Sequence, residues 1–501
     1  MCGLPGGVDT MNVVTDLPTS PRINSGNGRP VREERSYVLY WMIAARRTRS
    51  NFALDRAIAW AQALGKPLVV FEALRVDYPW ASDRLHRFVI DGMADNGEAF
   101  RPSPITYFPY VEPARGDGKG LLDAFAASAC VVVTDEFPCF FLPRMVRAAA
   151  ARLDVALETV DSNGLLPLTL ADRAYTAASH FRRFVQRELP AQLTKFPVEQ
   201  PLSGLQLPRL AQLPPPLTAR WQPVDARLLN RDAMLTSLPI DHDVPVAAMA
   251  GGSNAAERQL ETFIAARLDR YSDRHNHPDA NVTSRLSPYL HFGHISAHQV
   301  FSAVMRQQRW SPTVLRDARP TGAREGWWGV NPSAEAFLDQ LVVWRELAYN
   351  TSARLPDQYD RYESLPEWAR ETLQAHRDDP RAHLYTPAQF ETAATHDLLW
   401  NAIQRQLRQD GWFHNYMRML WGKKLLEYSK SPQQALGIMT AIMNRWSLDG
   451  RNPNAYAGYF WTLGRYDRPW PERAIYGKVR SMSSERTRKK VDVEEYLRTY
   501  G

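Results

Sequence analysis

The residues YVLYWMI (37–43), SNFALDRAIAWAQALG (50–65) and PLVVFEAL (67–74) decide the fold of the first third of the chain. The two outer runs are short and continuously apolar, whereas the middle run has apolar residues at helical spacing and closes at Gly65. This order of strand, helix and strand predicts a βαβ unit whose strands are buried on both faces.

The same cycle returns further along the chain, in ACVVVTDEF (129–137), LPRMVRAAAARL (142–153) and VALETVD (155–161). We therefore predict a doubly wound, Rossmann-like α/β domain over residues 37–165. It contains neither a GxGxxG nor a GxxxxGK[ST] motif, so a dinucleotide or nucleoside triphosphate has no phosphate loop to hold it. A ligand of such a sheet is expected at the carboxyl ends of the strands, near residues 41–47 and 134–138.

The rest of the chain divides by composition. Residues 1–36 mix Gly, Pro, Ser, Asn and Arg and are interpreted as a flexible leader without a signal peptide. Residues 166–250 are expected to be an interdomain linker, because a short basic helix is followed by a proline-rich stretch. From 251 to 501 the periodicity is helical almost throughout, which predicts an all-α domain.

The overall composition limits the class of protein. The 501 residues exceed one ordinary core, and the net charge of +7 is compatible with a polyanionic partner. Three cysteines (Cys2, Cys130 and Cys139) exclude a disulfide framework and suit a reducing compartment such as the cytoplasm. The sequence contains no run of eighteen apolar residues, so no membrane-spanning segment is predicted.

Aromatic and cationic residues alternate between Trp400 and Arg480. The tryptophans there are Trp400, Trp412, Trp421, Trp446, Trp461 and Trp470. The cations of the same segment include Arg418, Lys423, Lys424, Arg451, Arg465, Arg468 and Lys478. Aromatic faces beside cations suit a flat ligand or an extruded base. The alternative interpretation is a tryptophan-rich helical core with a solvated basic face.

Two motifs precede this segment. TSRLSPYLHFGHIS (283–296) places hydroxyl groups where a helix should start, which is typical of phosphate binding or of ordinary helix capping. Its histidines His291, His294 and His298 lack a neighbouring carboxylate or cysteine, so no metal site is predicted. FLDQLVVWRELAYN (337–350) is helical and puts Gln340, Trp344 and Leu347 on one stripe, as a core helix also would.

Three oxidisable rings are expected to pack together. Trp421 and Tyr428 lie two turns apart on one helix face, and Trp400 belongs to the preceding helix. Rings in contact can relay an electron by short steps. Without a redox cofactor, an aromatic core seam is the better interpretation.

Taken together, these segments resemble one family, the DNA photolyases and cryptochromes, and in particular the class II cyclobutane pyrimidine dimer photolyases. The resemblance spans residues 37–481. It is carried, in the family's order, by YWMI…NFAL, TSRLSPYLHFGHIS, FLDQLVVWREL, HDLLWNA, HNYMRMLWGKKLLE, LDGRNPNAYAG and RPWPERAIYGKVR.

The resemblance implies a light-driven DNA repair enzyme. Its helical domain would hold a U-shaped FAD, active in the reduced form, that passes an electron to a pyrimidine dimer flipped out of UV-damaged DNA. The α/β domain would be an antenna domain, with a deazaflavin or another chromophore. A monomer is the family expectation.

Site residues follow from the same resemblance. Arg418 and Asp449 are similar to the ion pair beside the isoalloxazine ring, and Asn444 to the residue facing flavin N5, with Asn454 as second choice. Trp400, Trp421 and Tyr428 would relay electrons. The remaining FAD contacts would come from Tyr271, Thr283, Ser284, Arg285, Leu286, Ser287 and Arg451.

On the DNA side, Trp344 and Trp461 are similar to the pair that clamps the dimer by stacking, while Gln340 would touch its carbonyl groups. Arg480 would enter the hole left in the duplex, and Arg468 would contact a phosphate. Arg274, Trp412 and Asn415 complete the expected DNA-binding set.

Three positions depart from the family pattern. Gln340 replaces a glutamate and cannot supply a proton or a charge. Tyr428 replaces the outer tryptophan and must lose a proton when it is oxidised. Asn452 replaces a frequent aspartate. These departures keep open a cryptochrome-like photoreceptor that does not repair, and a third alternative is a basic DNA-binding protein without a flavin.

Overall fold

Six strands form one sheet at one end of the protein, in the order β1-β6-β5-β2-β3-β4. The computed structural model describes residues 17–224 and 232–501. All strand pairs are parallel except β1 with β6. The strands are β1 Ile23–Ser25, β2 Tyr37–Met42, β3 Leu68–Leu74, β4 Thr106–Val111, β5 Ala129–Asp135 and β6 Leu157–Val160.

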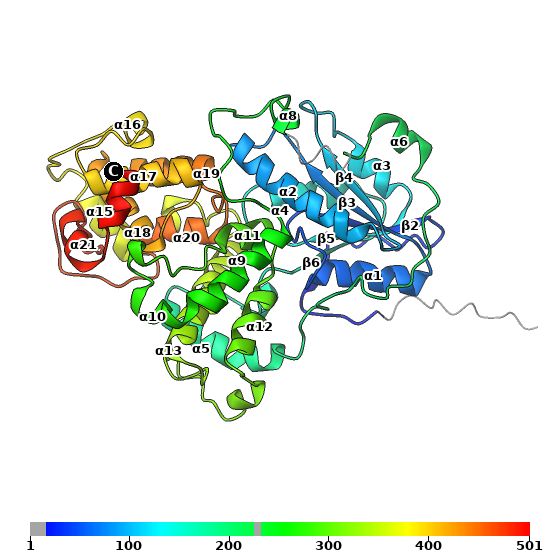
Figure 1. Ribbon diagram of the computed structural model, residues 1–501, viewed down its shortest axis with the longest axis horizontal. Coiled ribbons are helices and arrows are strands. Elements are labelled where there is room, and N and C mark those ends of the chain that lie inside the picture. Colours follow the sequence, from blue (N-terminus) through cyan, green and yellow to red (C-terminus); the bar gives the residue numbers. More distant parts are fainter. Residues whose placement is uncertain (1–16, 225–231) are drawn as a thin grey trace, which may run out of the picture.

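Helices cover both faces of this sheet, as the sequence predicts (Figure 1). Alternate residues of β2 enter two different cores. Val38 and Tyr40 pack with helix α1 (Phe52–Leu64), whereas Leu39 and Trp41 pack with helices α3 and α4 on the opposite face. The helices that follow the first strands are α2 Asp83–Phe100, α3 Leu121–Ala126 and α4 Leu142–Arg152. The doubly wound α/β fold is confirmed.

Two segments differ from the expectation. Residues 1–16 of the expected leader lie outside the described residues, but Ile23–Ser25 form the edge strand β1, antiparallel to β6. Within the expected linker, helix α5 (Ala178–Glu188) buries Phe181 and Phe184 in a core shared with Phe337. This part of the linker therefore belongs structurally to the helical half, because its apolar face has no other place to be buried.

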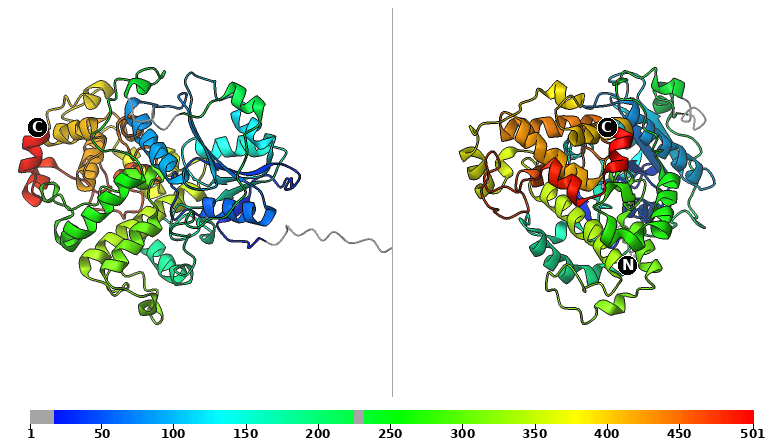
Figure 2. Two further views of the ribbon diagram at one scale, coloured as in Figure 1. Left: turned by 45° about the vertical axis from the view of Figure 1, so that its right-hand side comes forward. Right: turned by 60° about the vertical axis from the view of Figure 1, so that its left-hand side comes forward.

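The second half is helical, also as predicted, and lies beside the sheet with helices α21 and α22 on the side away from it (Figures 1 and 2). None of the described helices combines the length and apolarity needed to cross a membrane. The α-helices from the linker onward are α6 Pro215–Arg220, α8 Asp232–Leu235, α9 Ser253–Ala266, α10 Tyr271–Arg274, α11 Ser287–Phe292, α12 Ala297–Gln307, α13 Pro332–Leu338, α14 Arg345–Arg354, α15 Glu367–Ala375, α16 Pro387–Glu391, α17 Leu398–Asp410, α18 Asn415–Tyr428, α19 Pro432–Trp446, α20 Pro453–Thr462, α21 Ser484–Lys490 and α22 Glu494–Tyr500. Short 3₁₀ turns occur at Leu168–Leu170, Leu189–Gln192, Leu268–Arg270, Pro278–Ala280, Pro312–Leu315 and Tyr362–Ser364, and a π-helix at Asp339–Trp344.

Arg84 of α2 joins the two halves. Its guanidinium donates to Leu407 O at 3.2 Å and Arg408 O at 2.7 Å, two carbonyls of the last turn of α17. It also donates to Trp446 O, at the end of α19, at 2.7 Å. The last carbonyls of a helix have no partner within the helix and carry its negative dipole end. One fully buried cation from the sheet half therefore caps two helices of the other half.

We expect Arg84→Met to lower the free energy of unfolding by about 3 kcal/mol, because the buried carbonyls lose their donor. Urea unfolding measures this difference. Arg101→Met is the matched control, since Arg101 at the end of the same helix pairs only with exposed Glu98, and it should change stability by less than about 0.5 kcal/mol. Equal effects of the two substitutions would contradict the capping role.

Candidate functional site

A cavity of about 800 Å³ lies within the helical half, between α5, α10, α11, α18, α20 and the π-helix. This volume is in the range of cofactor pockets. Sixteen of the residues expected to bind a cofactor or DNA line it, although they come from distant parts of the chain: Tyr271, Thr283, Ser284, Arg285, Leu286, Ser287, Gln340, Trp344, Trp412, Asn415, Arg418, Asp449, Asn454, Trp461, Arg468 and Arg480.

The ion pair expected between Arg418 and Asp449 is present. Arg418 Nη2 lies 3.0 Å from both carboxylate oxygens of Asp449, and Ser447 Oγ donates to Oδ1 at 2.6 Å. Burial by itself raises the pKa of Asp449, but Arg418 and the hydrogen bond from Ser447 outweigh it, so the pKa lies below its ordinary value. The carboxylate therefore stays ionised, and the pair places a guanidinium in the cavity wall.

Three guanidinium groups of the wall have donors to spare. Arg285 Nε, Arg345 Nη1 and Arg418 Nε are buried and have no hydrogen-bond partner among the described residues. A buried charged donor without an acceptor is costly, and guanidinium groups favour phosphate and other anions. The wall thus fits a ligand with several negative charges, as the two phosphates and reduced ring of FAD would supply.

The TSRLS segment lies at this wall. Helix α11 begins at Ser287, and Arg285 occupies a left-handed backbone conformation with φ of 53°. Its guanidinium stacks 5.1 Å from the ring centre of Trp412 and donates to Asn281. The conformation turns the chain just before the helix, so that hydroxyl groups and a cation face the same cavity.

Gln340 and Trp344 line the cavity from a widened stretch of helix. Residues Asp339–Trp344 are π-helical, and the N–H of Arg345 donates to Gln340 O, five residues earlier. Such widened turns are frequent at functional sites. Leu347, the third member of the predicted stripe, is buried in the core instead.

Aromatic and charged groups alternate at one rim of the cavity. The Arg480 guanidinium lies 4.2 Å from the ring centre of Trp470 and 5.7 Å from that of Trp461. It pairs with Asp467 at 2.9 Å. Arg468 stacks on Trp470 at 5.5 Å. Arg480 is therefore held by an ion pair and by contacts with two rings.

Lys423 lies beneath Trp461. Its Nζ is fully buried, 4.8 Å from the ring centre, and donates to Thr462 O at 2.7 Å. Burial lowers the pKa of Lys423 to about 7. Below that pH the Trp461 ring lies against an ammonium group, and this cation–π contact favours one orientation of the ring.

Besides the three rings of the expected electron relay, three expected site residues do not line the cavity. Asn444 is fully buried, accepts from the N–H of Arg451 at 2.9 Å and donates to Tyr456 at 3.2 Å. Arg451 donates back to Asn444 O and to Ser447 O. Both side chains are therefore buried in hydrogen bonds within the protein, and their expected contacts with a flavin stay predictions. Asn454, the second choice, does line the cavity.

Arg274, expected to bind DNA, is the third residue outside the cavity. It is exposed and pairs with Asp492 at 2.7 Å, close to helix α22, rather than with the cavity. Asn452 keeps a local role, because its side chain caps α20 through Asn454 N and donates to His291 at 3.0 Å. Among residues 17–224 and 232–501, His, Cys, Asp and Glu form no group of three suited to a metal ion.

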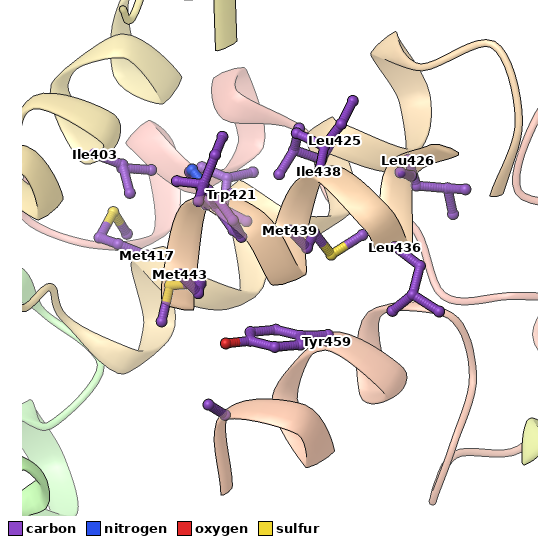
Figure 3. Packing of buried hydrophobic residues seen from close by; sticks show 14 of the residues in the cluster. Ile403, Met417, Trp421, Leu425, Leu426, Leu436, Ile438, Met439, Met443 and Tyr459 are labelled. Atoms are coloured by element: carbon purple, nitrogen blue, oxygen red, sulfur yellow. The ribbon is translucent and has the colours of Figure 1, made fainter. Parts of the chain in front are cut away.

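The aromatic seam begins behind the cavity wall. Trp400 and Trp421 stack with ring centres 6.4 Å apart and planes 8° apart. The Trp421 ring also packs against Phe413, which lines the cavity, at 5.8 Å. Figure 3 shows Trp421 among the apolar side chains of α18 and α19. Tyr428, at the end of α18, is buried in the same core.

Some residues of the cavity wall were not predicted from the sequence. Arg182 of α5 donates to buried Asp339 at 2.8 and 3.2 Å, and both residues line the cavity, as does Arg345. Asp339 precedes Gln340 in a quoted motif and could have been noticed there. Arg182 gave no local signal, since its partner is 157 residues away.

Known proteins are similar to this chain in sequence over nearly its whole length. The deoxyribodipyrimidine photo-lyase of Methanothermobacter thermautotrophicus is 33% identical over 477 residues, covering 95% of this chain and 97% of that protein. The enzyme of the same name from Arabidopsis thaliana is 29% identical over 488 residues, with 95% and 91% covered. That from Potorous tridactylus is 30% identical over 475 residues, with 93% and 82% covered. No family model matches the chain.

The fold has a solved counterpart. A bacterial class III photolyase from Agrobacterium tumefaciens superposes with a TM-score of 0.68 at 16% identity, covering 93% of this chain and 86% of that one. A doubly wound sheet joined to a helical half is thus the photolyase fold. With the sequence relatives, it follows that the chain belongs to the DNA photolyase and cryptochrome family.

Asp449→Asn should lower the free energy of unfolding by about 3 kcal/mol at neutral pH, because Arg418 loses its buried counter-charge. Since the folded pKa is lowered, this difference is complete above the ordinary aspartate pKa of about 4 and shrinks as the pH falls through the folded pKa. Urea unfolding from pH 7 to pH 3 measures it.

Asp492→Asn is the control, since Asp492 pairs with Arg274 at the exposed surface and should change stability by less than about 1 kcal/mol. If the loss of unfolding free energy caused by Asp449→Asn grew as the pH was lowered, the lowered pKa of Asp449 would be contradicted.

Proposed function

We propose that this protein is a light-driven DNA repair enzyme that splits cyclobutane pyrimidine dimers with reduced FAD as the electron donor. The observation that carries the proposal is the cavity itself. It joins a cationic wall, the TSRLS segment and two tryptophans, Trp344 and Trp461, in one space. Relatives of this chain are named deoxyribodipyrimidine photo-lyases.

FAD fits the cavity wall by its charge. Three guanidinium groups, those of Arg285, Arg345 and Arg418, each have one buried nitrogen without a hydrogen-bond partner among the described residues, and such donors suit phosphates and an anionic ring. The chemistry that reduced FAD would supply here, when excited by blue light, is transfer of one electron to the lesion. The Arg418–Asp449 pair is the counterpart expected beside such a ring, and Asn454 replaces Asn444 as our candidate for the residue facing it.

The lesion is held by stacking. Trp344 and Trp461 line the same cavity, and each base–aromatic stack contributes about 1–3 kcal/mol. Extruding a base costs a few kcal/mol and costs least at a damaged, poorly paired site, which favours the lesion over intact DNA. Gln340 can donate an amide hydrogen bond to a lesion carbonyl, but it cannot give a proton.

The finer classification is also a proposal. LDGRNPNAYAG and RPWPERAIYGKVR support the class II group, whereas the solved counterpart is a class III enzyme at only 16% identity. We further propose residues 37–165 as the antenna domain and 251–501 as the FAD- and DNA-binding domain, with α5 of the intervening segment contributing Arg182 to the cavity.

The direct test uses purified protein loaded with FAD, reduced without oxygen and mixed with an oligonucleotide that carries one thymine dimer. We expect recovery of the DNA absorbance under blue light, with several turnovers per protein and none in the dark. Gln340→Glu should repair at least as fast as the wild type. A protein that binds FAD but shows no light-dependent recovery would contradict the repair function and favour a photoreceptor.

Trp461→Ala should weaken binding of a dimer-containing duplex about tenfold or more, because one stack worth ~1.4 kcal/mol is lost. Binding of the undamaged duplex should stay unchanged. Fluorescence anisotropy with both duplexes measures the two affinities. Trp310→Phe is the control, since Trp310 bonds to Trp328 O within another core and does not line the cavity. An equal loss for both duplexes would contradict the clamp.

A further inference from the structure

Residues 467–480 form a short ribbon, here called the rim ribbon, that folds back on itself at the rim of the cavity. Arg473 and Gly477 exchange backbone hydrogen bonds of 3.0 and 2.7 Å next to its turn. The open end of the rim ribbon carries Arg468 and Arg480, which line the cavity. The turn lies against the end of helix α15 instead. The rim ribbon therefore links α15 to the cations at the cavity.

The return arm of the rim ribbon, residues 475–478, is anchored at two places. The N–H of Lys478 donates to Thr372 Oγ1 of α15 at 2.9 Å. The hydroxyl of buried Tyr476 donates to Glu427 of α18 at 2.8 Å. Because these contacts use a backbone N–H and a phenol, they stay in place over the neutral pH range.

The outgoing arm, residues 469–474, is largely exposed and is tied to the end of α15 through Glu472. Glu472 Oε1 lies 2.8 Å from His376 Nε2, while His376 Nδ1 lies 2.7 Å from Asp379 Oδ2. Asp379 Oδ2 also accepts from the N–H of Ile475 at 2.7 Å. One imidazole thus bridges two carboxylates, one from its own turn and one from the outgoing arm.

The complete bridge requires a protonated imidazole. A neutral ring has only one N–H, so its other nitrogen would turn a lone pair toward a carboxylate oxygen. Asp379 is held by Ile475 as well, whereas the Glu472 side chain is 57% exposed. Glu472 has no other side-chain partner within residues 17–224 and 232–501. Loss of the proton from His376 therefore releases Glu472 and leaves Asp379 in place.

The charges around the bridge set the pH at which it opens. The hydrogen bonds to Glu472 and Asp379 raise the pKa of His376 above its ordinary value. Lys478 lies near Glu472 and Arg381 near Asp379, and both cations help to keep these carboxylates ionised. Since the pKa is raised on folding, the bridge is complete below the ordinary histidine pKa of about 6.5. It is lost as the pH rises through the raised value.

We propose that His376 is a positioning residue for DNA binding, because its bridge to Glu472 holds the outgoing arm in the conformation that meets the duplex. The inference rests on the proposed function. The arm carries Trp470, on which Arg480 stacks at 4.2 Å and Arg468 at 5.5 Å. An arm that is already fixed loses less conformational entropy when DNA binds.

The bridge is tested first in the free protein, by NMR of isotope-labelled histidine between pH 5 and pH 9. His376→Gln identifies the signal of His376. We expect this histidine to titrate above pH ~6.5 in the wild type, and Glu472→Gln to lower its pKa because the amide carries no charge. A wild-type His376 that titrates at or below that pH would overturn the proposal.

DNA affinity is then measured by fluorescence anisotropy with a duplex that carries one thymine dimer. Between pH 6 and pH 9 the wild type should lose about threefold more affinity than Glu472→Gln, the size expected of an exposed ion pair. A glutamine can accept from a protonated imidazole and donate to a neutral one, so its contact survives at both pH values. Glu472→Ala should bind more weakly than the wild type at pH 6. The titration of Lys423 is common to all these proteins and cancels in the comparison.

His242→Gln is the matched control, since His242 pairs with Asp83 in the sheet half and should leave the wild-type pH profile unchanged. The proposal is overturned if wild type and Glu472→Gln have equal pH profiles, or if Glu472→Ala binds as tightly as the wild type at pH 6. A change of profile in His242→Gln as large as that in Glu472→Gln would also overturn it. Repair by chemically reduced wild type at pH 6 tests the proposed function separately, because the bridge is then complete.

Discussion

The buried ion pair between Arg418 and Asp449 is the constraint on which the functional half depends. Helix α18 is buried on almost every side, so apolar packing alone does not select which residue meets the cavity. Because each charge is buried, each requires the other. The pair thereby directs Arg418 to the cavity, and helix geometry places Trp421 one turn on, against the aromatic seam, and Tyr428 two turns further.

The turn that carries Asp449 also holds the two halves together. Arg451 adopts a left-handed conformation with φ of 57° and bonds to Asn444, while its carbonyl accepts from Cys139 in the sheet half. Gly450 has to be small there, because a side chain would meet Met443 O. Arg84 caps α17 and α19 close by. The same short segment therefore contributes both to the wall of the cavity and to the contact between the halves.

Local patterns predicted those parts of the fold that local physics controls. The βαβ unit at 37–74 was readable because buried parallel strands and an amphipathic helix have different periods. Strand β1 was missed, since three residues pairing through their backbone leave no side-chain pattern. Helix α5 was assigned to a linker because neighbouring prolines dominated the composition, whereas its apolar face packs on the helical half.

For the site, the sequence by itself determined which residue types were present and in what order. From these motifs, sixteen residues that line the cavity and the Arg418–Asp449 ion pair could be predicted. Only the tertiary structure decided that the Asn444 side chain is buried beside Tyr456 and does not line the cavity. It also decided that Arg182 pairs with Asp339 and that the Tyr428 hydroxyl donates to Asp397. These contacts join residues that lie in different elements. They depend on how whole helices pack, and helix packing leaves no period in the chain from which a partner can be read.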